Sequence, residues 1–163
     1  MERLGGGPMT APSHGTTMHG YEFNEPALRR EPLAYYARSG PVGQALALYH
    51  KKSNVAVIGL GTGALACYRR PGEKWTFFEI DPLVLRISSN RKYFTYLSDC
   101  AVRPRVVIGD ARLSLVKEPT GRFSLLIVDA FSSDAIPVHL LTREAFALYE
   151  RVLDAHGVLF VHI

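Results

Sequence analysis

The sequence contains few cysteines, no long apolar run and no concentrated basic segment, and each absence excludes a class of protein. Its two cysteines, Cys67 and Cys100, show neither metal-ligand spacing nor a disulfide framework, as is typical of a reducing compartment. No run approaches the ~20 apolar residues of a membrane span, and the N-terminus lacks the basic region and apolar core of a signal peptide. These observations predict a cytoplasmic location and no membrane segment in this chain.

The charged residues argue against a nucleic-acid partner. The 163 residues carry 19 Lys and Arg against 15 Asp and Glu, a net charge of +4, and the basic side chains are scattered rather than gathered in a stripe. Hydrophobic residues make up 47% of the chain, enough for a sizeable core, and the length fits one domain. We predict disorder over residues 1–13, which are rich in glycine, proline and threonine, and one domain over residues 14–163.

The stretch over residues 54–81 carries the clearest pattern in the chain. Residues 55–58 form a short β-branched apolar run, typical of a buried parallel strand, and a turn with Gly59, Gly61 and Gly63 follows it. Glycine there permits a positive φ and leaves no Cβ between the backbone and a ligand. A helix and a second strand are predicted next, so the stretch has the strand, glycine turn, helix, strand order of a nucleoside-binding unit.

The second strand of that unit, predicted over residues 75–80, brings acidic side chains to its end. Glu79 and Asp81 follow the glycine turn by about 20 residues, the spacing at which a carboxylate accepts hydrogen bonds from ribose hydroxyls. The glycine turn alone is weak evidence, because glycines occur in many purely structural turns. The acid at the strand end makes nucleoside binding the favoured interpretation.

Strands and helices continue to alternate along the chain and predict an α/β fold. A helical segment separates most predicted strands, which implies an open parallel sheet with helices on both faces and right-handed crossovers. The strands are expected near 55–58, 75–80, 105–108, 123–128 and 158–163, and helices near 42–50, 64–70, 113–116 and 141–154, with one more starting at Asp81 and Pro82.

The carboxyl ends of such strands meet at one edge of the sheet, where ligands bind. Glu79, Asp81, Asp110 and Asp129 all lie at the ends of predicted strands and are expected at that edge. Each acid taken alone is equally well explained as a cap of the helix that follows it. Four of them beside a glycine turn favour a binding site.

Two histidines near the N-terminus, His14 and His19, invite comparison with a metal site. Neither a carboxylate nor a third ligand lies at useful spacing from them, so no metal is predicted. A turn or a short strand pair that lines a pocket is the favoured interpretation.

Four segments together resemble the polyamine synthase (spermidine synthase) family, a branch of the S-adenosylmethionine-dependent transferases with a Rossmann-like fold. VIGLGTGA is similar to the family's glycine turn, FEID to its second strand, IGDAR to its third strand, and LLIVDAFSSDAIP to its fourth strand and catalytic loop. The resemblance runs from about His14 to the end of the chain. It implies that Glu79 binds the ribose hydroxyls, that Asp110 and the adjacent Ala111 bind the adenine, and that Asp129 is the catalytic aspartate.

The chain departs from the family pattern in several places. Its glycine turn carries Thr62 where the family has an aspartate that helps to hold the aminopropyl amine. Asp134 follows Asp129 with four residues between them, whereas the two loop acids of the family lie closer together. The amine-lining segment corresponds loosely to Tyr36 and Arg38, and arginine in place of a glutamate disfavours a cationic polyamine. Family members also continue beyond the fifth strand, so we expect the chain to be C-terminally short.

The resemblance implies transfer of an aminopropyl group from decarboxylated S-adenosylmethionine to a small-molecule amine, without a metal ion. Asp129 would orient and deprotonate the amine, with Tyr36 and Asp134 as further substrate-binding residues. Methyl transfer from intact S-adenosylmethionine is the first alternative, which Thr62 favours, and a non-catalytic nucleoside-binding module is the second. An NAD-dependent dehydrogenase is less favoured, because the turn lacks the wider G-x-G-x-x-G spacing. If the chain assembles, we expect a homodimer.

Overall fold

The computed structural model describes residues 9–10, 13–14, 17–18, 20–50, 53–101, 104–130 and 137–162. Its N-terminal part contains two short antiparallel strand pairs, β1 (Met9–Thr10) with β4 (Glu22–Phe23) and β2 (Ser13–His14) with β3 (Thr17–Met18). The β2–β3 pair confirms the strand pair expected beside the two histidines. β1 lies inside the segment for which the sequence indicated disorder.

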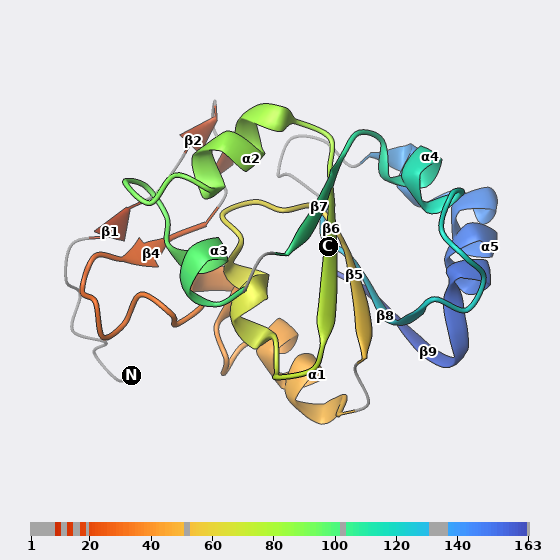
Figure 1. The fold of residues 1–163 in the computed structure, drawn as a ribbon, viewed down its shortest axis with the longest axis horizontal. Helices are drawn as coiled ribbons and strands as arrows, with labels where there is room; N and C mark the ends of the chain where they lie inside the picture. Colours follow the sequence, from red (N-terminus) through yellow and green to blue (C-terminus); the bar gives the residue numbers. More distant parts are fainter. Residues whose placement is uncertain are drawn as a thin grey trace.

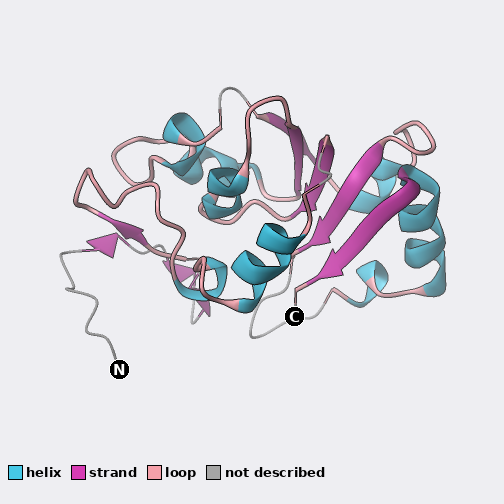
Figure 2. Ribbon diagram, turned by 90° about the horizontal axis from the view of Figure 1, so that it is seen from below, coloured by secondary structure: helices cyan, strands magenta, loops and turns pink. Residues whose placement is uncertain are grey.

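Five parallel strands form the main sheet, which is seen along its edge in Figure 1 and obliquely in Figure 2. The strands are β5 (Asn54–Ile58), β6 (Lys74–Glu79), β7 (Arg105–Ile108), β8 (Phe123–Val128) and β9 (Leu153–Val161). They lie in the order β7-β6-β5-β8-β9, so the glycine-bearing strand β5 is central and β8 is its neighbour. The parallel α/β sheet predicted from the sequence is confirmed.

Helices connect the strands, and three of the five α-helices begin at a residue whose side chain caps them, Asp81, Asp110 and Thr142. Asp81 Oδ1 accepts from the backbone N–H of Leu83, and Thr142 caps the last helix in the same way. Among the described residues, no helix has the length and apolar character needed to cross a bilayer. The α-helices are α1 (Pro41–Leu48), α2 (Pro82–Ser88), α3 (Tyr96–Asp99), α4 (Ala111–Leu115) and α5 (Arg143–Val152), and the 3-10 helices are η1 (Ala34–Tyr36), η2 (Ala64–Tyr68) and η3 (Val138–Leu140).

Several predicted boundaries were wrong. The helix expected over residues 64–70 is the shorter 3-10 helix η2. The last helix was expected to run to Asp154 and the last strand to begin at residue 158, but α5 ends at Val152 and β9 begins at Leu153. Leu153 pairs with Phe123 of β8, so a contact with a distant strand ends the helix.

Alternate residues of the central strands enter two separate cores, one on each face of the sheet. Val55 and Val57 pack with residues of α1, η2 and α3, whereas Ala56 and Ile58 pack with residues of α4, η3 and α5. Figure 1 shows these two groups of helices on opposite sides of the sheet. All six residues of β8 are buried, as expected of a strand covered on both faces.

The segment before the sheet is fixed to α3 by buried hydrogen bonds. The carboxylate of Glu22 accepts from the backbone N–H of Thr95 at 2.7 Å and from its hydroxyl at 2.8 Å. The hydroxyl of Tyr96 donates to the backbone oxygens of Tyr21 at 2.7 Å and Glu31 at 3.1 Å. The N-terminal segment is therefore held against the side of the sheet that carries η2 and α3.

Cys67 and Cys100 form a disulfide that joins η2 to the residue capping the end of α3. The expectation that these cysteines belong to no disulfide was wrong. They are 33 residues apart in sequence and become neighbours only because α3 packs against η2. The pair also removes the argument for a reducing compartment, which treated both thiols as free.

Gly59, the first residue of the glycine turn, lies against the strand end that carries Asp129. Its φ is 101°, and a Cβ built on it would be 2.4 Å from the backbone oxygen of Asp129. Gly63 is similarly confined, because its φ is 86° and its Cβ would be 2.8 Å from the side chain of Leu97. Both positions need glycine for backbone conformation and for space.

This close approach predicts that Gly59→Ala destabilises the fold more than Gly72→Ala. Both glycines have positive φ, 101° and 86°, which costs an L-residue roughly 1–2 kcal/mol. A Cβ on Gly72 meets no atom within 4 Å, whereas a Cβ on Gly59 must displace backbone, a further ~1–3 kcal/mol. Urea unfolding of both variants measures the difference, and equal losses would contradict the tight contact.

Candidate active site

The carboxyl ends of the five parallel strands bring the predicted site residues to one edge of the sheet. Gly59, Gly61 and Gly63 follow β5, and all three have positive φ. Glu79 is the last residue of β6, and Asp129 follows β8 directly. Asp81 and Asp110 come just after β6 and β7.

Glu79 joins the glycine turn to the segment that follows β6. Its side chain is buried, Oε2 accepts from the backbone N–H of Leu60 at 2.9 Å, and Oε1 accepts from that of Asp81 at 2.9 Å. An ionised carboxylate has about four lone-pair positions, so acceptor capacity remains for a ligand. Glu79 therefore shapes the turn and can also accept from a hydroxyl at the edge.

Asp81 and Asp110 each use one oxygen to cap a helix. Oδ1 of Asp110 accepts from the backbone N–H of Leu113 at 2.9 Å, at the start of α4, whose first residue is the buried Ala111. Oδ2 of Asp110 lies 3.6 Å from Nε2 of His139. The alternative that these acids cap helices is thus correct for one oxygen of Asp81 and one oxygen of Asp110. A cavity of about 510 Å³ reaches the edge beside Asp110 and is lined there by Arg112, Leu113 and His139.

Asp129 caps no helix among the described residues and is held by side chains from distant elements instead. Its Oδ2 accepts from the hydroxyl of Tyr36 at 2.8 Å, and its Oδ1 lies 2.7 Å from Nδ1 of His162. Only 11% of the side chain is exposed. The predicted partners Asp129 and Tyr36, 93 residues apart in sequence, are brought into contact.

His162 was missed by the sequence reasoning. It follows β9 and therefore reaches the same edge as Asp129, which follows the neighbouring strand β8. Its ring lies 6.2 Å from that of Tyr35, 5.9 Å from that of Tyr36, and stacks on Phe160 at 6.4 Å. A polar residue directly after an apolar parallel strand was the available signal.

Asp129 raises the pKa of both side chains that contact it, Tyr36 and His162. Burial, followed by the charge of Asp129 and the hydrogen bond to it, raises the pKa of Tyr36 well above its usual range. The hydrogen bond with Asp129 raises the pKa of His162, although burial opposes it. Tyr36 therefore remains a hydrogen-bond donor, and His162 keeps its second proton to a higher pH than an ordinary histidine.

Thr62, at the position where the resemblance leads one to expect an acid, is buried in the glycine turn. Its hydroxyl has no hydrogen-bond partner among the residues that the structure describes, and a Cβ on Gly20 would lie 3.0 Å from it. Buried hydroxyls are usually paired, so this atom is a candidate contact for a polar group of a ligand.

The sequence also connected Arg38 and Asp134 with the amine. Arg38 pairs with Glu31 at 2.9 Å, and its guanidinium lies 5.2 Å from the ring centre of Tyr68. It does not contact Asp129. Asp134 lies outside the described residues, so its proposed role in holding the amine stays a prediction.

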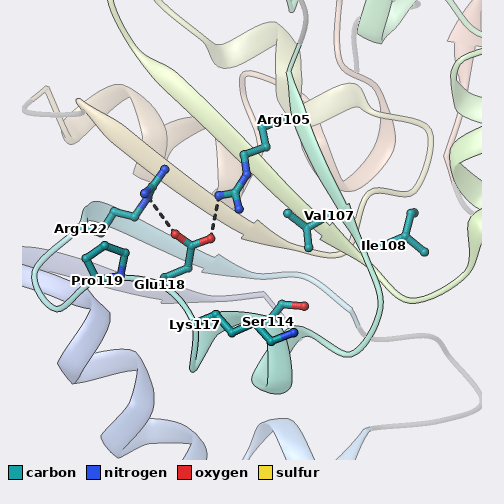
Figure 3. A pocket seen from close by; sticks show the side chains of 8 residues that line it. All are labelled: Arg105, Val107, Ile108, Ser114, Lys117, Glu118, Pro119 and Arg122. Atoms are coloured by element: carbon teal, nitrogen blue, oxygen red, sulfur yellow. Dashed lines mark hydrogen bonds and ion pairs between the residues drawn. The ribbon is translucent and has the colours of Figure 1, made fainter.

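A second cavity, of about 370 Å³, runs beside the edge strand β7 (Figure 3). The carboxylate of Glu118 projects toward two guanidinium groups and accepts from Arg105 at 2.7 Å and from Arg122 at 3.1 Å. Arg105 begins β7 and Arg122 directly precedes β8, so these ion pairs lie at the amino ends of the strands. The cluster joins β7 to β8 and is not part of the strand-end edge.

The Asp129–His162 pair predicts a pH-dependent contribution to stability. Because the folded state raises the pKa of His162, the pair stabilises the fold fully below the ordinary histidine pKa of about 6.5. That contribution is lost as the pH rises through the raised value. His162→Gln should therefore lower the free energy of unfolding more at about pH 5.5 than at about pH 9. Urea unfolding at both pH values measures this, and a loss independent of pH would contradict the pairing.

No family model matches the chain. Over 114 residues it is 31% identical to a polyamine aminopropyltransferase of Vibrio vulnificus (strain CMCP6), an alignment that covers 67% of this chain and 37% of that protein. The chain thus spans little more than a third of this curated relative.

Solved structures resemble the chain over most of its length. A probable spermidine synthase from Corynebacterium glutamicum ATCC 13032 superposes with a TM-score of 0.67 at 18% identity, covering 94% of this chain and 59% of the other. A spermidine synthase in complex with the transition-state analogue AdoDATO superposes with a TM-score of 0.59 at 21% identity, covering 93% and 56%. At these identities the likeness shows the fold.

Proposed function

Since the chain is spermidine synthase-like in sequence and has the Rossmann-like transferase fold, we propose that it transfers an aminopropyl group from decarboxylated S-adenosylmethionine to an amine. The observation that carries the proposal is the position of Asp129. It is the strand-end acid that is mostly buried, caps no helix among the described residues and contacts Tyr36. An acid held in this way can orient an amine beside a nucleoside bound at the same edge.

The nucleoside would lie across the ends of β5, β6 and β7. Glu79 would accept from the ribose hydroxyls with lone pairs that Leu60 and Asp81 leave free, and Asp110 would accept from the adenine amino group. Ile80, directly after β6, is 66% exposed, and such an apolar side chain suits the flat face of a base. The complex of a spermidine synthase with AdoDATO supports a ligand of the S-adenosylmethionine type for this fold.

Aminopropyl transfer makes limited chemical demands on the site. The amine attacks the carbon beside the sulfonium, and sulfur leaves as a neutral thioether, so no acid is needed for the leaving group. The site must align the two reactants and supply a deprotonated amine, because a primary amine with a pKa near 10.4 is mostly protonated at neutral pH. Asp129, in contact with Tyr36, would hold that amine, and Asp134 is a proposed second contact.

Methyl transfer from intact S-adenosylmethionine is a second candidate, and Thr62 favours it. Threonine in the glycine turn lacks the negative charge that would hold the ammonium of an aminopropyl group. Its unpartnered hydroxyl can instead contact an uncharged or anionic group.

A cytoplasmic location and a homodimer are further parts of the proposal. Titration of free thiols would test the location, and light scattering would test the homodimer.

Nucleoside binding should depend on Glu79. Glu79→Ala removes charge-assisted hydrogen bonds worth ~1.5–3 kcal/mol each, so calorimetry with methylthioadenosine should show at least a tenfold loss of affinity. Glu73→Ala is the matched control, because Glu73 is equally buried, accepts from the backbone of Arg70 and the indole of Trp75, and lies at the opposite end of β6. If both variants bind alike, Glu79 does not contact the nucleoside.

The choice of co-substrate separates the two chemistries. Offered decarboxylated S-adenosylmethionine with putrescine, the protein should release methylthioadenosine. Offered intact S-adenosylmethionine, it should release no S-adenosylhomocysteine, because the carboxylate would lie near the acids of the edge. S-adenosylhomocysteine as the only product would favour methyl transfer over aminopropyl transfer. Tight nucleoside binding without either product would favour a binding module.

A further inference from the structure

We propose that His162 accepts the proton that the attacking amine loses, while Asp129 and Tyr36 are positioning residues for its imidazole. The inference rests on the proposed aminopropyl transfer and assigns its proton-transfer step to a residue that the resemblance does not point to. It differs from the simpler scheme, in which Asp129 itself takes the proton.

The hydrogen bonds of Asp129 support this division of roles. Oδ1 faces Nδ1 of His162 at 2.7 Å, and Oδ2 faces the hydroxyl of Tyr36 at 2.8 Å. Each oxygen of Asp129 thus has one protein partner, and one of them holds Nδ1 of His162. A base whose second ring nitrogen is oriented by a carboxylate is a recurrent arrangement for proton transfer.

The remaining ring nitrogen of His162, Nε2, has no hydrogen-bond partner among the residues that the structure describes. The side chain is 24% exposed, so the imidazole is not fully enclosed. The titratable groups that face the ring are Asp129 from the end of β8 and the hydroxyl-bearing rings of Tyr35 and Tyr36 from η1, and Phe160 of its own strand stacks on it. Within the part of the chain that the structure describes, Asp129 is the charged group that acts on this ring.

Base strength also favours the imidazole. Ordinary carboxyl groups have pKa values near 4 and histidine has one near 6.5, so an imidazole takes a proton from an ammonium with a smaller uphill step. The contact with Asp129 raises the pKa of His162 further in the same direction. The neutral imidazole becomes available as the pH rises through that raised pKa.

The step balances as follows. Neutral His162 takes one proton from the ammonium of the acceptor through Nε2 and becomes an imidazolium, which Asp129 stabilises through Nδ1. The freed lone pair of the amine forms the new C–N bond at the carbon beside the sulfonium. The C–S bond breaks with its electron pair passing to sulfur. The products are methylthioadenosine and a secondary ammonium, so two positive charges are present before and after.

The test compares pH profiles of kcat/KM for the full chain with decarboxylated S-adenosylmethionine and putrescine. Wild type should show an acid limb from His162. His162→Gln should lose that limb and fall ~10²–10⁴-fold in rate, the range typical of losing a general base. Asp129→Asn should keep the limb but shift it to lower pH, because the neutral amide no longer raises the pKa of His162. His156→Gln, which changes an exposed histidine of β9, is the matched control and should match wild type.

Two further measurements separate the possible failures. Calorimetry with methylthioadenosine should give equal affinities for wild type and His162→Gln, which shows that the variant is folded. Nitrogen NMR titration of His162 should show its protonation midpoint falling in Asp129→Asn. An acid limb and rate unchanged in His162→Gln would overturn the assignment while leaving aminopropyl transfer intact. An inactive wild-type protein that binds nucleoside would overturn aminopropyl transfer and the assignment with it.

Discussion

The contact between Gly59 and the backbone of Asp129 is the constraint on which the site depends. Gly59 N donates to Phe78 O at 2.8 Å, and Asp129 N donates to Ile58 O at 2.8 Å, so the residues that follow β5 and β8 remain hydrogen-bonded to the neighbouring strands β6 and β5. The two backbones approach so closely that a Cβ on Gly59 would lie 2.4 Å from the oxygen of Asp129. The glycine turn and the acid are therefore placed side by side by the sheet itself, and neither can move without the other.

The acids of the edge serve the structure, and the proposed function gives them ligand binding as a second role. Each oxygen of Glu79 accepts from a backbone N–H group at 2.9 Å, which fixes the carboxylate and leaves further lone pairs unused by these bonds. The same division applies to Asp110, which caps α4 with one oxygen. Carboxylates fixed in this way need little rearrangement when a ligand arrives, which is the main source of strong electrostatic binding in such sites. A role of these acids in holding the backbone is thus compatible with a role in ligand binding.

Much of this arrangement was predictable, because local patterns determine it. Apolar runs broken by glycine or acid mark parallel strands, and their alternation with helices fixes the edge at which Glu79 and Asp129 meet. What escaped prediction depends on contacts between distant segments. Leu153 continues a helical pattern but pairs with Phe123, and the disulfide exists only because α3 packs on η2. His162 carries no motif, and its importance appears only when β9 is seen beside β8.

The charge balance around Asp129 differs from what the sequence suggested. Arg38 was expected to repel a cation, but its guanidinium is paired with Glu31 and both side chains are about half exposed, so its field at the site is small. The protonation of His162 matters more. While the imidazole is charged, the pair with Asp129 is neutral overall and attracts an ammonium weakly. Once the imidazole loses its proton, the pair carries a net negative charge, and the neutral imidazole can accept a proton. Under the proposed aminopropyl transfer, a single titration would therefore couple capture of the amine to its activation.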